Sequence, residues 1–283
     1  NTIHTSEPSM EELITTVQNM LLCRTGEISG TDDEDRIYDN LLDMWAFELK
    51  LTNNEVSPDS TWYSKAFDYW EDESKCPITD DGVLGGFGSV TPVDVKESNA
   101  FLDKVLDLRP DLNPLKRVAD CGAGIGRVSK NFLLHRAAHV DLVEQSPRLL
   151  NASAGYIGSD SARTTCICSN LQNFKPEPGT YDIIWIQWVV GHLHDLDYID
   201  FFRSCIRGLT PRGVVVLKDN TVDDWTFVVD KEDSSVTRSS SYSRILFELA
   251  EVEVLIEERQ QEFPADLNPI NMFALVPKGT SYP

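Results

Sequence analysis

The chain has 283 residues, a length that fits one large α/β domain with an extension but not three domains of usual size. Apolar residues make up 41% of the sequence, enough for a sizeable core, and no run approaches the roughly 18 consecutive apolar residues of a membrane span. The formal net charge of −21 argues against nucleic acid as the main partner, because phosphate binding needs a cationic surface. We therefore expect no nucleic acid and no membrane as partners, and the charge favours a cationic one.

The first part of the chain carries most of the negative charge. Residues 1–60 are expected to form an acidic, mainly helical extension in front of a larger domain over residues 61–283. Apolar spacing predicts helices over Met10–Leu22 and Tyr38–Leu51, with a polar acidic loop at Ser29–Asp35 between them. No pattern of reactive residues appears here, so solubility and attraction of a partner both stay open.

A segment rich in aromatic residues and glycine follows. Trp62–Trp70 is compatible with a helix, and residues 97–108 have helical apolar spacing. Between them, Thr79–Gly88 contains four glycines, which permit positive φ angles and close approach of the backbone to another group. A loop that contacts a ligand and an ordinary connection are both compatible with this pattern.

The rest of the chain alternates between strand-like and helix-like segments. Strands are expected at Arg117–Cys121, His139–Val143, Thr164–Cys168, Tyr181–Ile186, Gly213–Leu217, Val252–Glu257 and Met272–Val276. Helices are expected at Arg127–His135, Pro147–Tyr156, Leu196–Leu209 and Ser239–Leu249. Cys121, Cys166 and Cys168 fall in the strands and are expected to be buried.

This alternation predicts an α/β fold with a parallel sheet covered by helices on both faces. Only a short loop joins the last two strands, so we expect the last strand to be antiparallel. A Rossmann-like sheet of seven strands with the last one reversed resembles class I methyltransferases that use S-adenosylmethionine (SAM).

A glycine-rich turn follows the first of these strands. Asp120 is followed by Gly122, Gly124 and Gly126 in a GxGxG pattern, which is typical of SAM sites rather than of the GxGxxG dinucleotide fingerprint. The second strand is followed by Glu144, 22 residues after Gly122, where a carboxylate can accept hydrogen bonds from ribose hydroxyls. The combination predicts that Gly122, Gly124 and Glu144 bind SAM, with S-adenosylhomocysteine as product.

Four more residues are expected around the same ligand. Leu171 and Gln172 follow the third strand and would flank the adenine, and Gln187 ends the fourth strand at the same crevice. Arg127 would pair with the methionyl carboxylate, although an arginine in this position can also be a surface residue. No metal is expected, because the sulfonium of SAM is already an activated methyl donor.

Several longer motifs resemble one family, the protein α-N-terminal methyltransferases. They are Asp81–Gly88, Trp185–Leu193, Leu217–Asn220, Asp233–Arg238 and Glu258–Gln260. The resemblance covers about residues 62–278 and leaves residues 1–60 outside. It implies methylation of the free α-amino group of proteins that begin with X-Pro-Lys or X-Pro-Arg after removal of Met, in the cytoplasm and nucleus.

The resemblance also implies roles for individual residues. An α-amine has a pKa of about 8 and must lose a proton before it can attack a methyl group, and Asp233 and His192 resemble the family's bases. Asn220 resembles the residue that hydrogen-bonds the first substrate residue, and Trp188 resembles the aromatic that packs on the substrate proline. Asp230 resembles the carboxylate that helps to hold the third-position cation.

The remaining substrate contacts lie upstream, and two positions depart from the family pattern. Leu84 and Gly85 are expected to line the substrate channel, and Tyr69 to cap the site. Asn271 stands where the family commonly has an aromatic, which changes the substrate entrance. Gly86 stands where a monomethylating relative has a larger side chain, so we expect successive methylation to the dimethyl or trimethyl state.

Two alternatives stay open at this point. One is a SAM enzyme that acts on a lysine side chain or a small amine. The other is a non-catalytic SAM-binding adaptor that uses residues 1–60 as an interaction arm. The presence of Asp233, His192 and Asn220 argues against the adaptor, and the sequence leaves the oligomeric state undetermined.

Overall fold

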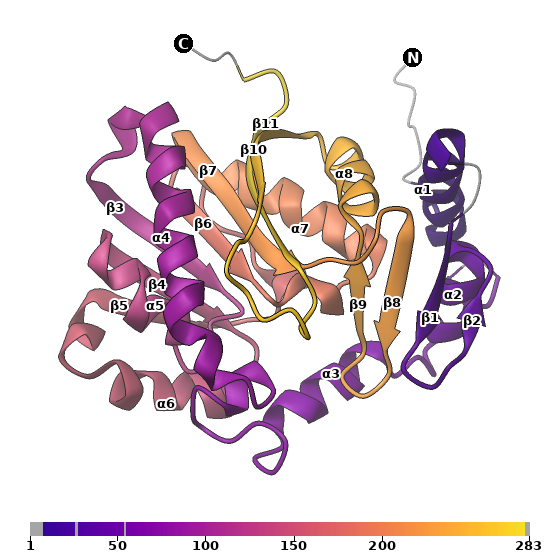
Figure 1. The fold of residues 1–283 in the computed structure, drawn as a ribbon, viewed down its shortest axis with the longest axis horizontal. Helices are drawn as coiled ribbons and strands as arrows, with labels where there is room; N and C mark the ends of the chain where they lie inside the picture. The colour runs from indigo at the N-terminus through magenta and orange to yellow at the C-terminus, as the bar shows by residue number, and fades with distance from the viewer. Residues whose placement is uncertain (1–7, 26–27, 54, 281–283) are drawn as a thin grey trace.

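The computed structural model describes residues 8–25, 28–53 and 55–280, and its centre is a seven-stranded sheet (Figure 1). The strands lie in the order β10-β11-β7-β6-β3-β4-β5, and β11 runs antiparallel to both β7 and β10. The fold predicted from the sequence is therefore confirmed. The strand bounds are Leu115–Cys121 (β3), Ala137–Glu144 (β4), Thr164–Cys168 (β5), Tyr181–Gln187 (β6), Leu209–Asn220 (β7), Val252–Arg259 (β10) and Ile270–Pro277 (β11).

Helices cover both faces of this sheet. The helices around the sheet are α4 (Thr91–Leu108), α5 (Arg127–Asn131), α6 (Pro147–Ile157), α7 (Asp195–Gly208) and α8 (Ser240–Leu249). Successive side chains of a strand point to opposite faces of its sheet, and both faces of β6 are apolar. Ile184 packs in one apolar cluster with Phe201 of α7, and Ile183 packs in another with Phe101 of α4. Within the described parts of the chain, no helix combines the length and apolar character needed to cross a bilayer.

The N-terminal region contains strands as well as the expected helices. Helices α1 (Met10–Thr25) and α2 (Leu41–Glu48) precede α3 (Trp62–Glu71), and β1 (Ser29–Asp32) and β2 (Ile37–Tyr38) lie between α1 and α2. The prediction of a loop at Ser29–Asp35 was therefore wrong for its first half. The apolar side chains of α1 and α2 belong to the same apolar cluster as those of α7 and α8. The domain boundary near residue 60 stays a prediction.

A hairpin that the sequence analysis missed joins this region to the main domain. Strands β8 (Thr226–Asp230) and β9 (Ser235–Arg238) form a second sheet in the order β2-β1-β8-β9, in which β1 runs parallel to β8 (Figure 1). Each strand has only four or five residues, so its apolar pattern is too short to identify without its partner.

Short 3-10 turns form the remaining elements. Two of them, η1 (Gly82–Leu84) and η2 (Gly88–Val90), give order to the glycine-rich segment before α4. The others are η3 (Pro110–Leu112), η4 (Leu133–His135), η5 (Gly158–Arg163), η6 (Leu171–Asn173) and η7 (Val190–His192). Cys121 is buried as expected, but Cys166 and Cys168 are exposed because β5 is the edge strand of the sheet.

Candidate active site

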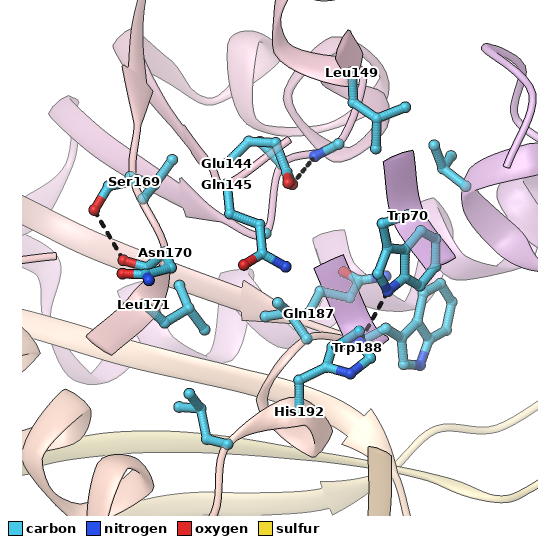
Figure 2. Close-up of a pocket in the computed structure, with 18 of the residues that line it drawn as sticks. Trp70, Glu144, Gln145, Leu149, Ser169, Asn170, Leu171, Gln187, Trp188 and His192 are labelled. Atoms are coloured by element: carbon cyan, nitrogen blue, oxygen red, sulfur yellow. Dashed lines mark hydrogen bonds between the residues drawn. The ribbon is translucent and has the colours of Figure 1, made fainter. Parts of the chain in front are cut away.

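A cavity lies outside the carboxyl ends of the central parallel strands, and we call it the donor cavity (Figure 2). This is the position at which doubly wound sheets bind ligands. Its walls include all of the residues predicted to bind SAM: Gly122, Gly124, Arg127, Glu144, Leu171, Gln172 and Gln187. They come from the ends of β3, β4 and β6, the start of α5 and the turn η6.

The glycine turn of the donor cavity is held by two buried carboxylates. Gly122 has φ +74°, and a Cβ placed there would lie 2.6 Å from Val189, so only glycine fits. The Gly124 amide donates to Glu144 Oε2 at 2.9 Å, and burial raises the pKa of Glu144. Asp120 accepts from the amide and the hydroxyl of Ser129 at 3.0 and 2.6 Å, and burial raises its pKa to about 6.

A buried charged network stands behind Arg127 in the donor cavity. Asp94 pairs with the Arg127 guanidinium at 2.8 Å and with Lys218 Nζ at 2.5 Å, and it also accepts from Gln187 Nε2 at 2.8 Å. Two cations therefore share one carboxylate, and they hold the pKa of Asp94 below its usual value despite its burial. Sequence reasoning missed Asp94 and Lys218, although a lysine inside the apolar run of β7 was a usable signal.

A second cavity adjoins the first, and we call it the acceptor cavity. It is lined by η1, the ends of β6 and β7, the hairpin β8–β9 and the loop before β11. Trp188, Asn220, Asp233, His192 and Leu84, all predicted from the sequence, lie in its walls. Both cavities share Trp70, Val83, Trp188, Val189 and His192, and Figure 2 shows Trp70, Trp188 and His192 close together.

Both ring nitrogens of His192 have partners. Trp70 Nε1–H donates to Nε2 at 3.0 Å, as the dashed line in Figure 2 shows. Nδ1 lies 3.1 Å from the carbonyl oxygen of Ser234 and must therefore carry the proton. The main chain of His192 is held as well, because Trp62 Nε1–H donates to its carbonyl oxygen at 2.7 Å. Trp70 was not predicted, since its helix showed only an aromatic-rich pattern.

Asp233 presents a carboxylate that is not fully satisfied. Burial raises the pKa of Asp233, a hydrogen bond from Ser235 opposes this, and the net shift is upward. Its Oδ1 is shielded from solvent and has no hydrogen-bond partner among the described residues. Asp219, to which the sequence analysis gave no role of its own, lines the same cavity, and burial raises its pKa to about 7.

Three residues predicted to contact substrate lie outside the walls of both cavities. Asp230 closes the turn of the hairpin by accepting from the amide of Glu232 at 2.7 Å. Tyr69 lies near this acidic turn, and burial together with the carboxylates of Glu232 and Asp233 raises its pKa. Gly85 follows η1 with φ +57°, and a Cβ added there would have no atom within 4 Å.

The two departures from the family pattern also have defined positions. Asn271 pairs in register with Asp219 across β11 and β7, and its side-chain amide donates to the hydroxyl of Ser240. It lies behind the acceptor cavity rather than in its wall. Gly86 has φ +91°, and a Cβ there would meet no atom within 4 Å.

Comparisons with known proteins agree with this geometry. A family model described as AdoMet dependent proline di-methyltransferase matches residues 58–276. The alpha N-terminal protein methyltransferase 1 of Dictyostelium discoideum is 42% identical over 252 residues, which is 87% of this chain and 90% of the relative. The N-terminal Xaa-Pro-Lys N-methyltransferase 1 of Mus musculus is 39% identical over 226 residues, which is 80% of this chain and 100% of the relative.

A solved structure gives the same answer. A SAM-dependent methyltransferase from Leishmania major superposes with a TM-score of 0.79 at 37% identity, covering 88% of this chain and 96% of that one. The resemblance inferred from the sequence motifs is thereby confirmed. The chain belongs to the AdoMet-dependent proline di-methyltransferase family and is a SAM-dependent methyltransferase.

Proposed function

We propose that this enzyme transfers methyl groups from SAM to the free α-amino group of proteins that begin with X-Pro-Lys or X-Pro-Arg. The observation that carries the proposal is the junction of the two cavities at Trp70, Trp188 and His192, with a buried carboxylate, Asp233, on the acceptor side. The names of the Dictyostelium and mouse relatives, which refer to protein N-termini and to Xaa-Pro-Lys, support it.

The residues of the donor cavity fit SAM. Arg127 lines the cavity and shares the single carboxylate of Asp94 with the buried Lys218, so its guanidinium is only partly neutralised and is available to the methionyl carboxylate. Glu144 stands at the end of β4 to accept from the ribose hydroxyls, and Leu171 and Gln172 would flank the adenine. Bound SAM supplies a methyl group on a positively charged sulfur, and the protein supplies orientation.

The residues of the acceptor cavity suit an amine that must lose a proton. Asp233 Oδ1 is free to accept one, and its raised pKa brings it closer to that of the amine. His192 Nε2 accepts the indole N–H of Trp70, so it takes up a proton only if this hydrogen bond breaks. We therefore assign proton removal to Asp233 first and give His192 a second, supporting role.

The substrate contacts follow from the same walls. Asn220 at the end of β7 would hydrogen-bond the first residue, and the Trp188 ring would pack on the proline. Leu84 lines the channel, with Gly85 beside it and Tyr69 covering the site. Asp230 on the outer end of the hairpin would contribute negative charge for the third-position cation.

We also propose that methylation proceeds beyond one methyl group. The support for this is the resemblance, in which a monomethylating relative carries a larger side chain at Gly86; in the structure Gly86 is exposed and lies outside the walls of both cavities. A substrate that begins with proline would reach the dimethyl state, and other first residues the trimethyl state.

Mass spectrometry of a Ser-Pro-Lys peptide incubated with the enzyme and SAM tests the function, with the N-acetylated peptide as control. We expect two or three added methyl groups on the free peptide and none on the blocked one. Methylation of the blocked peptide would support a lysine side-chain acceptor, and absence of methylation on both would support the adaptor. The location in cytoplasm and nucleus stays a prediction, which fluorescence microscopy of the tagged chain tests.

A further inference from the structure

The turn of the hairpin β8–β9 contains one cation among three acids. Asp230, Glu232 and Asp233 surround Lys231 in the sequence, and Asp233 faces the acceptor cavity. If the proposed function holds, Asp230 and Asp233 must be available to the cationic residue and the amine of a substrate. A lysine side chain is long and flexible enough to reach carboxylates on its own turn, so Lys231 is a potential competitor for them.

In the structure, this lysine forms an ion pair with a glutamate of the N-terminal region. Lys231 Nζ lies 2.7 and 3.0 Å from the two carboxylate oxygens of Glu48 in α2. The side chains are only 17% and 7% exposed, so the pair is shielded from solvent. The Tyr38 hydroxyl bridges two carboxylates, at 2.6 Å from Glu48 Oε1 and 2.9 Å from Asp32 Oδ2, and the centre of the Phe47 ring lies 4.7 Å from Lys231 Nζ.

The position of the turn does not depend on this ion pair. Strand β1 pairs with β8 over four residues, and Gly30 lies so close to Phe227 that a Cβ there would be 2.3 Å from its ring. Beyond the strands, the Asp33 amide donates to the carbonyl oxygen of Val229 at 3.2 Å, and the Lys231 amide donates to Asp33 Oδ1 at 2.8 Å. Contacts with β1 and Asp33 therefore fix the turn, and the Glu48 carboxylate acts on the charge and direction of the Lys231 side chain.

We propose that Glu48 is a positioning residue for substrate binding, which neutralises Lys231 and holds its ammonium group away from Asp230 and Asp233. Without the charge of Glu48, the ammonium is free to turn toward the acids that the substrate needs, where it would repel a cationic peptide and compete for its partners. Glu48 lies outside the residues 58–276 that the family model matches, so the segment before the family domain contributes to the specificity of the site.

Peptide kinetics with two variants of the full chain test the proposal. Glu48→Gln keeps the size of the side chain and removes its charge, and we expect the KM for a Ser-Pro-Lys peptide to rise on the order of fivefold. The kcat at saturating peptide and the affinity for SAM should not change. Adding Lys231→Met to Glu48→Gln removes the competing cation, and we expect the KM to return to the wild-type value.

A raised KM with an unchanged kcat distinguishes a positioning role of Glu48 from a simple loss of stability. A partly unfolded variant would lose kcat in proportion to its folded fraction and leave KM unchanged, which thermal unfolding of each variant checks. Glu248→Gln is the control for loss of a glutamate charge that pairs the N-terminal region with the main domain, because Glu248 pairs with Arg24 at 3.2 Å between α8 and α1 and makes no contact with Lys231. Its KM should equal that of the wild type.

Two results would overturn the proposal. The first is an unchanged KM in Glu48→Gln, and the second is a double variant whose KM stays as high as that of the single variant. A wild-type enzyme that methylates neither peptide would instead refute the proposed function, so the two failures are distinguishable.

Discussion

The donor and acceptor cavities share a wall but differ in charge and in construction. The donor cavity is built on the ends of neighbouring strands of one sheet, and behind its wall two cations, Arg127 and Lys218, share one carboxylate, Asp94. The acceptor cavity contains the carboxylates of Asp219 and Asp233 and depends on a hairpin and on loops. The Arg127 end of the donor cavity therefore suits an anionic group, and the acceptor side suits an ammonium.

The two sides also differ in how far their polar groups are satisfied. In the donor cavity, Glu144 and Gln187 have hydrogen-bond partners within the protein. On the acceptor side, Asp233 Oδ1 is shielded from solvent without a partner among the described residues, and so is Trp188 Nε1 in the wall that the two cavities share. Buried polar groups without partners raise the free energy of the folded state, so a ligand that satisfies them gains affinity. This difference indicates that the acceptor side is completed by substrate.

The largest effect is expected from Asp233→Asn, which removes the free carboxylate oxygen and leaves the shape of the site. We expect kcat to fall by about a hundredfold to ten-thousandfold, with SAM affinity unchanged in a direct binding measurement. Glu232→Gln, an exposed change in the same turn, is the control. Full activity in Asp233→Asn would end the assignment of this residue as the base.

The same residue predicts the pH dependence. Protonated Asp233 cannot accept the proton of the amine, and burial raises its pKa, so kcat/KM should fall on acidification at a pH above that of an ordinary aspartate. Asp233→Asn should lose this acidic limb of the pH–rate profile.

The next effect lies on the donor side. In Arg127→Gln the methionyl carboxylate loses a charged partner, so we expect SAM affinity to fall by at least about tenfold by calorimetry, while the peptide KM stays constant. Lys218 still pairs with Asp94 in this variant, which preserves the folded network. A rise in peptide KM without loss of SAM affinity would contradict the assignment of Arg127 to SAM binding.

A smaller effect concerns Asp219 and stability. The pKa of Asp219 is about 7 in the folded protein against a usual 3.8, so folding favours its protonated form. Its contribution to stability is complete below pH 3.8 and is lost as the pH rises through 7. The unfolding free energy of the wild type should therefore fall between pH 5 and pH 8. In Asp219→Asn we expect this fall to be smaller by about 1 to 2 kcal/mol, a value that allows for partial solvation of the side chain. Denaturant titrations at both pH values measure this, and equal losses in both proteins would contradict it.

The smallest effect is expected from Trp188→Ala. Loss of ring packing should reduce the preference for proline over alanine at the second position of the peptide by about threefold to tenfold in kcat/KM. Trp188→Phe keeps a flat ring and serves as the control. An unchanged preference in Trp188→Ala would remove this tryptophan from substrate recognition.

Sequence reasoning worked best where local patterns and function coincide. The seven strands of the main sheet were found within a few residues, and the turn from Gly122 to Gly126 was placed correctly after its first strand. Helix α4 begins at Thr91, six residues earlier than residue 97, because Pro92 is compatible with a first helical turn. The hairpin β8–β9 was missed because such short strands become recognisable only when β1 pairs with them.

By itself, the sequence determined the sheet and the donor-binding turn, because a strand with its apolar run and a glycine that needs positive φ are both fixed by local chemistry. Only the tertiary structure decided which polar groups meet. The pairs Asp94 with Lys218, Trp70 with His192, and Glu48 with Lys231 join residues more than 120 positions apart. No spacing along the chain encodes such contacts, because they arise from the packing of elements that must first be formed.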